Sequence, residues 1–399
     1  TMGRYFTLLS RWINITLLYL LGKPPGRVIH ALNELVHVEP FQTLFYGIFW
    51  VFVLVVLAPV AGMGLFVLTV CKLLLYLTGF GSSRIKNKKE LAVVVTGCDR
   101  GFGLDIALGL EERGFHVFAG CLSTESFAQF KDRANITPVQ LDVTKEEEIK
   151  ASVKVVTSWI EQGGNPKRFL HAIVNNAGVG RPGLVDWNRI EDFQFCLEVN
   201  LLGMIRTTKA YLSIFKNQIR NGNDCARIVN ITSMAGLVAS GIATPYCASK
   251  HAAEAFSNCL RLELGSFGIP VVTINPTFHE TRMASTMGDE WRKLWNRLDP
   301  NLQKEYGEEY FEGLLRLVNV AKSVMWPAHM VSNQVVEAVE LVNPPWKMLV
   351  GLDAKFIFPL LRMLPVWLFD LLAPKPLNPP DLVAETERTK DEEAKHKED

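Results

Sequence analysis

The chain has 399 residues, 48% of them apolar, and a formal net charge of +1. That length is too great for one average domain and too small for three. The near-neutral charge gives no reason to expect nucleic acid as a partner, and the seven scattered cysteines form no C-x-x-C pair that would indicate zinc or a disulfide framework.

The N-terminal part predicts an attachment to a membrane. Residues 1–40 are mixed in composition and show no clean signal-peptide pattern. Residues 41–80 are almost unbroken apolar sequence, whereas one spanning helix needs only about 20 such residues. A proline and two glycines midway allow either a hairpin of two short spans or one span with an interfacial piece. Basic residues follow at 84–89, and because positive flanks stay cytosolic we expect the rest of the chain to face the cytosol.

From residue 85 the pattern changes to alternating strands and helices. The run "ELAVVV" is short, apolar and rich in Val, which is typical of a buried parallel strand, and "LDIALGLEERG" predicts a helix. Further strand-like runs are "FHVFAGCL", "ITPVQLDVT", "LHAIVNNAG", "ARIVNITS" and "IPVVTINPT", and a helix is expected over 145–162. This alternation predicts an α/β fold with a Rossmann-type doubly wound parallel sheet over residues 85–345.

Three glycines, Gly97, Gly101 and Gly103, lie between the first strand and the first helix. Glycine lets the backbone turn tightly and approach a pyrophosphate, and the helix N-terminus supplies unpaired N–H groups and a positive dipole end. The spacing is G-x-x-x-G-x-G, and its place between a Val-rich strand and a helix indicates a dinucleotide site. The alternative is a glycine-rich turn that binds nothing.

A tyrosine and a lysine stand four residues apart in "YCASK", at Tyr246 and Lys250. On a helix such positions share one face. We therefore expect the ammonium to lower the pKa of the phenol from its usual value of about 10, so that the tyrosine can exchange a proton near neutral pH. The alternative is a surface tyrosine beside a solvated lysine.

Together these segments resemble the short-chain dehydrogenase/reductase family over roughly residues 90–345. The motifs occur in the family's order: Thr96–Gly103, Asp142 in "LDV", "NNAG" at Asn175–Gly178, Asn200 in "EVNLLG", Ser233 in "NITSMAG", and Tyr246 with Lys250. "TGCDRGFG", "RLELGSFGI" and "YGEEY" are similar to the membrane-bound branch of retinol, 17β-hydroxysteroid and 3-hydroxybutyrate dehydrogenases. The resemblance implies an NAD(P)-dependent enzyme acting on CH–OH groups, in the endoplasmic reticulum membrane.

The resemblance also implies roles for individual residues. Tyr246 would be the general acid in carbonyl reduction and the general base in alcohol oxidation, and Lys250 would lower its pKa and bind the nicotinamide ribose. Ser233 would donate to the substrate oxygen, and Asn200 would hold a water that links Lys250 to solvent. No metal is needed. The cofactor contacts implied are Thr96, Gly97, Arg100, Gly101, Phe102, Gly103, Asp142, Asn175, Ala177, Gly178, Tyr246, Lys250, Pro276 and Thr277.

Several of these residues have structural alternatives. Asp142 would accept from the adenine amine, but it could instead cap the helix that follows. Ser233 could cap a turn, and Asn175 is expected to tie adjacent strands together. The spacing of three histidines is not that of a metal site, and we assign no function to them: His171, His251 and His279.

The choice between NAD and NADP stays open at this point. An acidic residue at the end of the second strand usually binds the ribose 2′-OH of NAD, but Cys121 stands there. Arg100 could pair with a 2′-phosphate, whereas the resembled branch favours NAD, so we expect NAD by a small margin. Where the family has Pro-Gly beside the nicotinamide, this chain has Pro276-Thr277, which leaves the shape of that loop open.

The C-terminal third bears on the substrate. Residues 279–330 are predicted to form an irregular helical lid, whose Trp and Tyr side chains suit a bulky apolar ligand but could equally be packing. Residues 346–382 are apolar and rich in Pro, which is typical of a membrane-touching segment or of a helix packed on the domain. Residues 383–399 are charged, and we expect them to form a disordered tail.

We therefore expect a membrane-anchored oxidoreductase for a lipophilic small molecule such as a steroid or retinoid, with a homodimer as a further expectation from the family. One alternative is a 3-hydroxybutyrate-type enzyme for a small hydroxy acid. The other is a non-catalytic, membrane-anchored scaffold that keeps the fold without turnover.

Overall fold

The computed structural model describes residues 70, 83–164, 167–223 and 226–364. By internal contacts the chain divides into two units, Thr1–Phe80 and Gly81–Asp399, and the description below concerns the second. Apart from Val70, the predicted membrane segments at 41–80 lie outside the described residues, as does the predicted charged tail. Within the described ranges, no helix is both long and apolar enough to cross a membrane.

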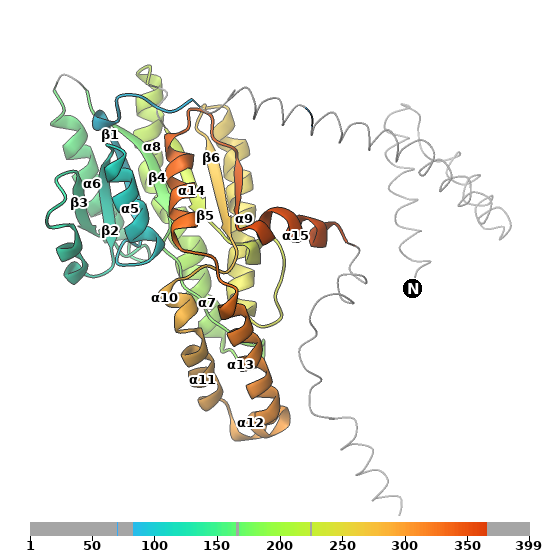
Figure 1. Ribbon diagram of the computed structural model, residues 1–399. Helices are drawn as coiled ribbons and strands as arrows, with labels where there is room; N and C mark the ends of the chain where they lie inside the picture. Colours follow the sequence, from blue (N-terminus) through green and yellow to red (C-terminus); the bar gives the residue numbers. More distant parts are fainter. Residues whose placement is uncertain (1–69, 71–82, 165–166, 224–225, 365–399) are drawn as a thin grey trace, which may run out of the picture. The chain divides into compact units, whose positions relative to one another are not determined.

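A seven-stranded parallel sheet forms the centre of this unit, as the alternation of strands and helices predicts (Figure 1). In spatial order the strands are β3 (Ile136–Gln140), β2 (His116–Cys121), β1 (Leu91–Thr96), β4 (Phe169–Asn175), β5 (Arg227–Ile231), β6 (Val271–Pro276) and β7 (Lys347–Val350). Every residue of β1 is buried, which explains the Val-rich run. The order along the chain reverses between β1 and β4, and in such sheets ligands bind at this point, beyond the carboxyl ends of the strands.

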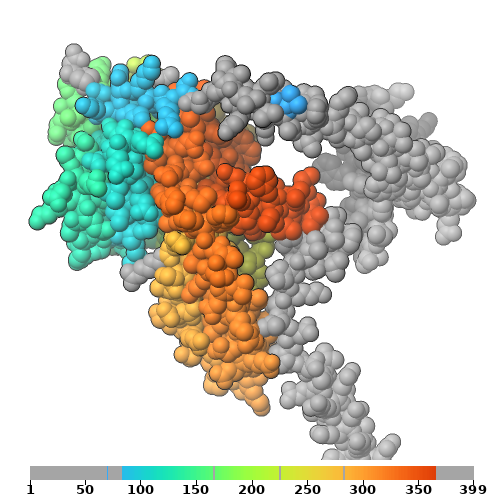
Figure 2. Space-filling view, in the orientation of Figure 1, coloured from blue at the N-terminus to red at the C-terminus, as the bar shows by residue number. Residues whose placement is uncertain are grey.

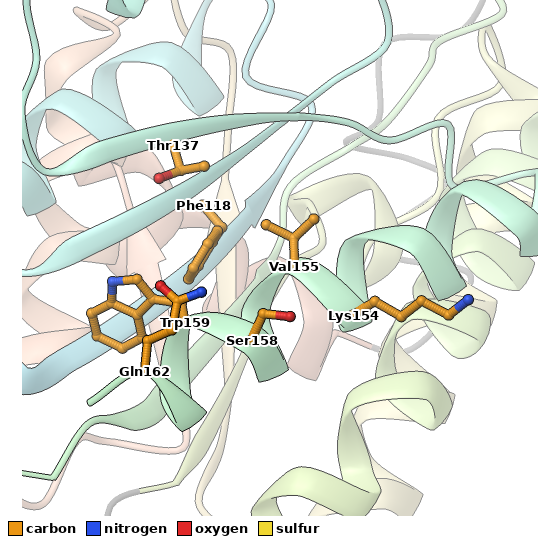
Figure 3. Close-up of a pocket in the computed structure, with 7 residues that line it drawn as sticks. All are labelled: Phe118, Thr137, Lys154, Val155, Ser158, Trp159 and Gln162. Atoms are coloured by element: carbon orange, nitrogen blue, oxygen red, sulfur yellow. The ribbon is translucent and has the colours of Figure 1, made fainter. Parts of the chain in front are cut away.

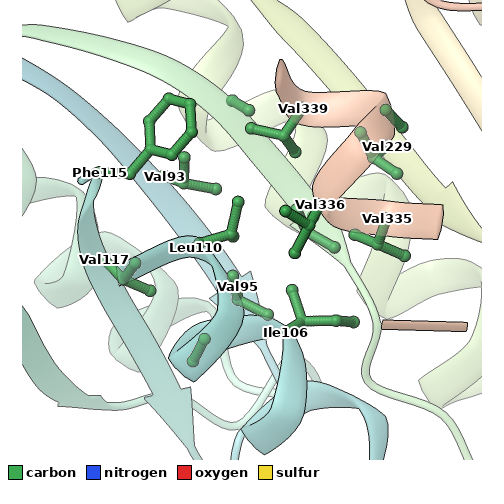
Figure 4. Close-up of a cluster of buried hydrophobic side chains, with 14 of the residues drawn as sticks. Val93, Val95, Ile106, Leu110, Phe115, Val117, Val229, Val335, Val336 and Val339 are labelled. Atoms are coloured by element: carbon green, nitrogen blue, oxygen red, sulfur yellow. The ribbon is translucent and has the colours of Figure 1, made fainter. Parts of the chain in front are cut away.

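Helices cover both faces of the sheet. One face carries α5 (Phe102–Glu112) and α14 (His329–Glu340), which lie side by side (Figure 1). The opposite face carries α6 (Glu146–Glu161), α8 (Met204–Arg220) and α9 (Thr244–Gly265). Alternate side chains of β1 enter the two cores, because successive residues of a strand point to opposite faces. Figure 4 shows the first core, where strand valines meet α5 and α14: Val93, Val95, Ile106, Leu110, Val335, Val336 and Val339.

The remaining elements connect these layers. They are η2 (Lys88–Glu90), η3 (Thr124–Phe130), α7 (Ile190–Leu197), the π-helix η4 (Glu198–Gly203), η5 (Met234–Gly236), α10 (Arg282–Ser285), α11 (Met287–Asn296), α12 (Pro300–Tyr306), α13 (Glu308–Ser323) and α15 (Leu352–Met363). The observed α6 matches the helix expected over 145–162 to within one residue at each end.

The predicted lid is helical, and its aromatic side chains pack on one another. Helices α10 to α13 span Arg282–Ser323, and a separate apolar core lies between them and the segment after β4. At its centre the buried Trp187 contacts Trp291 edge-on, at 5.9 Å between ring centroids, and Tyr306 at 5.1 Å. Of the two interpretations left open for these aromatics, the structure supports packing, because these rings fill a core of their own.

Candidate functional site

The glycine-rich loop joins β1 to α5 and has a backbone that only glycine adopts easily. Gly97 and Gly101 have positive φ values of 72° and 59°. A Cβ on Gly103 would lie 2.1 Å from the carbonyl oxygen of Gly97, so α5 can approach the loop only without a side chain there. A Cβ on Gly101 would meet nothing within 4 Å, which leaves open space at the N-terminus of α5. These features fit a dinucleotide pyrophosphate.

Two residues after β4 hold this loop in place. The Thr96 hydroxyl accepts from the main-chain N–H groups of Asn176 and Ala177, both at 3.0 Å. The Asn176 side chain donates back to the carbonyls of Thr96 at 2.7 Å and Gly97 at 3.1 Å. Sequence reasoning missed Asn176, although the doubled Asn of "NNAG" was a signal for it. Asn175 ties adjacent strands, as expected, by donating to Asn230 of β5 at 2.8 Å.

A second missed residue, Asp99, brings a carboxylate from the glycine loop to the end of β2. Its oxygens accept from the main-chain N–H groups of Leu122 at 2.9 Å and Ser123 at 3.0 Å, and from the Ser126 hydroxyl at 2.9 Å. In the sequence, the end of β2 carries Cys121 and no acidic residue. In the structure, Asp99 brings a carboxylate to this position from another part of the chain. Arg100 beside it is exposed and makes no ion pair with a described residue.

Asp142 does not cap α6. Its Oδ1 accepts from the main-chain N–H of Thr144 at 2.9 Å and from the Thr144 hydroxyl at 2.7 Å, which closes a turn before the helix. The capping position belongs to Lys145, whose side chain makes no cap hydrogen bond. Burial alone would raise the pKa of Asp142, but the hydrogen bonds from Thr144 and the nearby Lys145 leave it below its usual value. The carboxylate is therefore ionised at neutral pH and available to accept from a ligand.

Ser233, Tyr246 and Lys250 come together where β5 ends and α9 begins. Ser233 follows β5 and accepts from the main-chain N–H of Ala235 at 3.1 Å, so it does cap the short turn η5. Its hydroxyl donates to the carbonyl of Pro276 at 3.4 Å and is near enough to the Tyr246 hydroxyl to lower the Tyr246 pKa. Lys250, one turn along α9, places Nζ 5.8 Å from the centroid of the Tyr246 ring. A serine hydroxyl, a phenol and a buried ammonium thus surround one point at the carboxyl end of the sheet.

The Tyr246 pKa is not lowered by Lys250, contrary to the expectation from the sequence. Burial raises the pKa of Tyr246 to about 12, and the hydrogen bond with Ser233 partly opposes that shift. Lys250 does not lower the Tyr246 pKa here, and its Nζ donates to the main-chain carbonyl of Ile231 at 3.0 Å. Burial also lowers the pKa of Lys250 to about 8.

Asn200 lies in the π-helix η4, and its side chain makes hydrogen bonds within the protein. Its Oδ1 accepts from the main-chain N–H of Val179 at 2.8 Å, and its Nδ2 donates to the Val179 carbonyl and the Ser249 hydroxyl, both at 2.9 Å. A Cβ on Gly178 would lie 3.3 Å from Asn200 Oδ1 and 3.6 Å from Lys250 Nζ. Asn200 is therefore close to Lys250, but both hydrogens of its amide nitrogen already have acceptors.

A buried polar network beneath Ser233 was also missed. Glu254, one turn beyond Lys250 on α9, accepts from the Thr232 hydroxyl at 2.5 Å, from the Asn275 side chain, and from Lys347 of β7 at 2.6 Å. Asn275 also donates to the carbonyl of Ser233 at 3.2 Å. The network joins α9, β5, β6 and β7 directly below the residue expected to bind the substrate oxygen, and so fixes that residue's main chain.

The shape of the loop after β6, which Pro276-Thr277 left open, is set by contacts with the C-terminal segment. The Thr277 hydroxyl donates to Asp353 of α15 at 3.0 Å, and its main-chain N–H donates to Val350 at 3.3 Å. The side chain of Thr277 is therefore committed to the C-terminal segment, and this loop offers the cleft its main chain and the side chains that follow.

A separate surface depression of about 390 Å³ lies between β2, β3 and α6 (Figure 3). Its lining contains none of the residues expected in the site: Phe118, Thr137, Lys154, Val155, Ser158, Trp159 and Gln162. Within the described residues, no group of three or more His, Cys, Asp or Glu side chains could hold a metal ion. The chemistry expected from the sequence therefore concentrates at the carboxyl ends of β1, β4, β5 and β6.

Known proteins are similar to this chain in sequence and in fold. The family model described as short chain dehydrogenase matches residues 91–291. Retinol dehydrogenase 16 of Mus musculus is 34% identical over 295 residues, which cover 72% of this chain and 89% of that protein. The chain belongs to the short-chain dehydrogenase/reductase family. It lies in the retinol dehydrogenase-like branch, with 36% identity to short-chain dehydrogenase/reductase family 9C member 7 of Mus musculus over 72% of this chain and 90% of the relative.

This short-chain dehydrogenase/reductase is also similar to the mitochondrial D-beta-hydroxybutyrate dehydrogenase of Rattus norvegicus, at 33% identity over 63% of this chain and 74% of that protein. A solved short-chain dehydrogenase/reductase from Burkholderia phymatum in complex with NAD superposes with a TM-score of 0.57 and 21% identity, over 75% of this chain and all of that one. At that identity the likeness concerns the fold. The family and its dehydrogenase relatives make this protein an NAD(P)-dependent oxidoreductase that acts on CH–OH groups.

Proposed function

We propose that this short-chain dehydrogenase/reductase transfers a hydride between NAD and the hydroxyl or carbonyl group of a lipophilic substrate, such as a retinoid or steroid, at a membrane. The observation that carries the chemistry is the convergence of Ser233, Tyr246 and Lys250 beside the glycine-rich loop. The presence of all three argues against the non-catalytic scaffold.

The proposed mechanism follows from these positions. The bound dinucleotide supplies the nicotinamide carbon that accepts or gives the hydride. In oxidation, Tyr246 takes the proton from the substrate hydroxyl while the hydride leaves the substrate carbon that bears this hydroxyl, and a carbonyl forms. In reduction, Tyr246 returns the proton to the oxygen. Ser233 donates to that oxygen and stabilises its negative charge, and the charge of Lys250 favours the deprotonated phenol once a ligand draws its Nζ toward the cleft.

The charges on the substrate side favour an uncharged substrate. A small hydroxy acid needs a free cation for its carboxylate. Arg181, on the segment after β4, instead lies 3.5 Å from Asp192 and 3.9 Å from Glu290, and it stacks on Phe195. Arg297 is paired with Asp192 as well. These ion pairs favour a retinoid or steroid over 3-hydroxybutyrate as the substrate. The small hydroxy acid stays the second candidate because of the similarity to D-beta-hydroxybutyrate dehydrogenase.

Helix α15 supports contact with a membrane. Its exposed apolar side chains include Phe356, Ile357, Leu360 and Met363, with Phe356 67% and Met363 82% exposed. In Figure 2 the red surface of this helix projects from the body of the domain. Exposed apolar side chains gathered on one helix mark a contact surface. We propose that α15 rests on the cytosolic face of the endoplasmic reticulum membrane, where a lipophilic substrate is concentrated.

Asp99 supports NAD as the cofactor. Its carboxylate bonds to the two main-chain N–H groups that follow β2, where an acid would meet the ribose 2′-OH and repel a 2′-phosphate.

The proposal is tested with purified, detergent-solubilised full-length protein. The measurement is kcat/KM for all-trans-retinol, a 3-hydroxysteroid and 3-hydroxybutyrate, each with NAD. We expect turnover of a lipophilic alcohol and none of 3-hydroxybutyrate, and Arg181→Ala to leave the ranking unchanged. Preferred turnover of 3-hydroxybutyrate that Arg181→Ala abolishes would instead establish the hydroxy-acid activity.

A further inference from the structure

A buried carboxylate, Glu254, lies close to Lys250 at the end of β5. It is one turn beyond Lys250 on α9, and both residues are only 4% exposed. Nζ of Lys250 donates to the carbonyl of Ile231 at 3.0 Å. Oε1 of Glu254 accepts from the hydroxyl of Thr232, the next residue of the chain, at 2.5 Å. The two opposite charges therefore meet the end of the same strand, in a region from which water is excluded.

The same carboxylate is also paired with a second cation. Nζ of Lys347, on the edge strand β7, lies 2.6 Å from Oε2 of Glu254, and the two side chains are 14% and 5% exposed. Asn275 of β6 donates to Oε1, beside Thr232. Glu254 is therefore placed between two ammonium groups, that of Lys250 in the expected active site and that of Lys347 at the edge of the sheet.

Glu254 brings the negative charge to the surroundings of Lys250. The other titratable groups of the described residues that face Lys250 are Tyr246 on the same helix and the Cys196 thiol of α7. Burial raises the pKa of Tyr246 to about 12 and that of Cys196 to about 11, so both are neutral near pH 7. Burial lowers the pKa of Lys250 to about 8, and Cys196 and Glu254 oppose that shift.

Charges in a buried site act on one another strongly, because little water screens them. A carboxylate beside Lys250 favours its ammonium form, whereas a cation paired with that carboxylate weakens this effect. We propose that Glu254 and Lys347 are positioning residues that act through Lys250: Glu254 keeps the buried Lys250 charged, and Lys347 limits how strongly it does so. The inference rests on the proposed function, because it concerns the charge of Lys250 in that reaction.

The test follows two quantities as a function of pH in the detergent-solubilised full chain. One is the affinity for NADH, measured by NADH fluorescence, which should fall where Lys250 loses its proton because NADH is an anion. The other is kcat/KM for all-trans-retinol with NAD. The variants are Glu254→Gln, Lys347→Met and the two together, each checked for folding by thermal unfolding. The matched control is Glu263→Gln, because Glu263 is an exposed carboxylate on the same helix.

We expect Glu254→Gln to move both pH midpoints about one unit lower, because Lys250 then loses its proton more easily. Loss of this negative charge also lowers the pKa of Tyr246, so both groups move the profile in the same direction. Lys347→Met should move the midpoints about half a unit higher, because the carboxylate then acts on Lys250 alone. The double variant should return close to the wild type, and Glu263→Gln should not differ from it.

A loss of rate or stability with unmoved midpoints would overturn the inference and leave Glu254 a structural residue. Shifts in the same direction in both single variants would overturn it too. If Glu254→Gln does not fold, Lys347→Met decides, because loss of packing alone gives no upward shift of a pH midpoint. Failure of the proposed function is distinct: the wild type would then oxidise no lipophilic alcohol, while the NADH midpoints would still move with the variants.

Discussion

Nζ of Lys250 donates to the main-chain carbonyl of Ile231, the last residue of β5, at 3.0 Å. The bond turns the ammonium toward the end of the sheet and leaves it 5.8 Å from the centroid of the Tyr246 ring. In this arrangement burial decides both pKa values, raising that of Tyr246 to about 12 and lowering that of Lys250 to about 8. We infer that the catalytic charges are set only when a ligand occupies the cleft and gives Lys250 another partner.

Replacing Tyr246 with Phe removes the proposed proton donor and acceptor. We expect kcat to fall about 10²- to 10⁴-fold while the affinity for NADH is kept. Steady-state kinetics and dinucleotide titration measure the two quantities. Tyr211→Phe is the matched control, because Tyr211 is buried and its hydroxyl contacts Ser152 at 2.8 Å, away from the site. Unimpaired turnover in Tyr246→Phe would refute the proposed role.

Ser233→Ala should move the pH profile as well as lower the rate. The Ser233 hydrogen bond lowers the Tyr246 pKa, so its loss lets that pKa rise. Oxidation needs the deprotonated phenol, so its rising limb should shift to higher pH. In reduction, where the protonated phenol acts, the falling limb should shift the same way. We expect kcat to fall about 10²- to 10³-fold. A rate loss with an unmoved profile would mean that Ser233 does not tune Tyr246.

Glu254→Gln should destabilise the fold, because the largely buried Lys347 then loses its counter-charge. Breaking one partner of a buried pair costs about 3–5 kcal/mol. Urea unfolding measures the loss, and Glu254→Gln with Lys347→Met should recover most of it. The exposed pair Glu146–Lys150 on α6 is the control, where Glu146→Gln should cost less than about 1 kcal/mol. A similar cost at both pairs would contradict the buried network.

Cofactor choice should follow Asp99 more than Arg100. We expect the wild type to bind NADH more tightly than NADPH, and Asp99→Asn to narrow the difference severalfold, about 1 kcal/mol, by removing the charge near the 2′ position. Arg100→Ser should leave the affinity for NADH unchanged, and so should the control Arg292→Ser, which lies far from the site. The opposite result, NADPH bound more tightly and lost in Arg100→Ser, would make Arg100 a 2′-phosphate ligand and the protein NADP-dependent.

Local pattern was enough to predict much of this protein. The Val-rich runs predicted the buried strands, and the glycines between β1 and α5 predicted the loop whose φ values require them. The four-residue spacing of Tyr246 and Lys250 predicted their common helix, α9. These features depend on residues close in sequence, where periodicity and backbone sterics decide the outcome. The sequence by itself therefore determined the element order, the parallel sheet and the residue types at the expected active site.

Only the tertiary structure decided which groups meet across the sheet. The bonds of Asp99 to the end of β2, of Glu254 to Lys347 and of Lys250 to Ile231 join segments whose distance in space no local pattern encodes. The same holds for the contact of His279 with Phe102. The pKa values depended on burial, which arises only when layers pack. The expected lowering of the Tyr246 pKa was wrong for this physical reason.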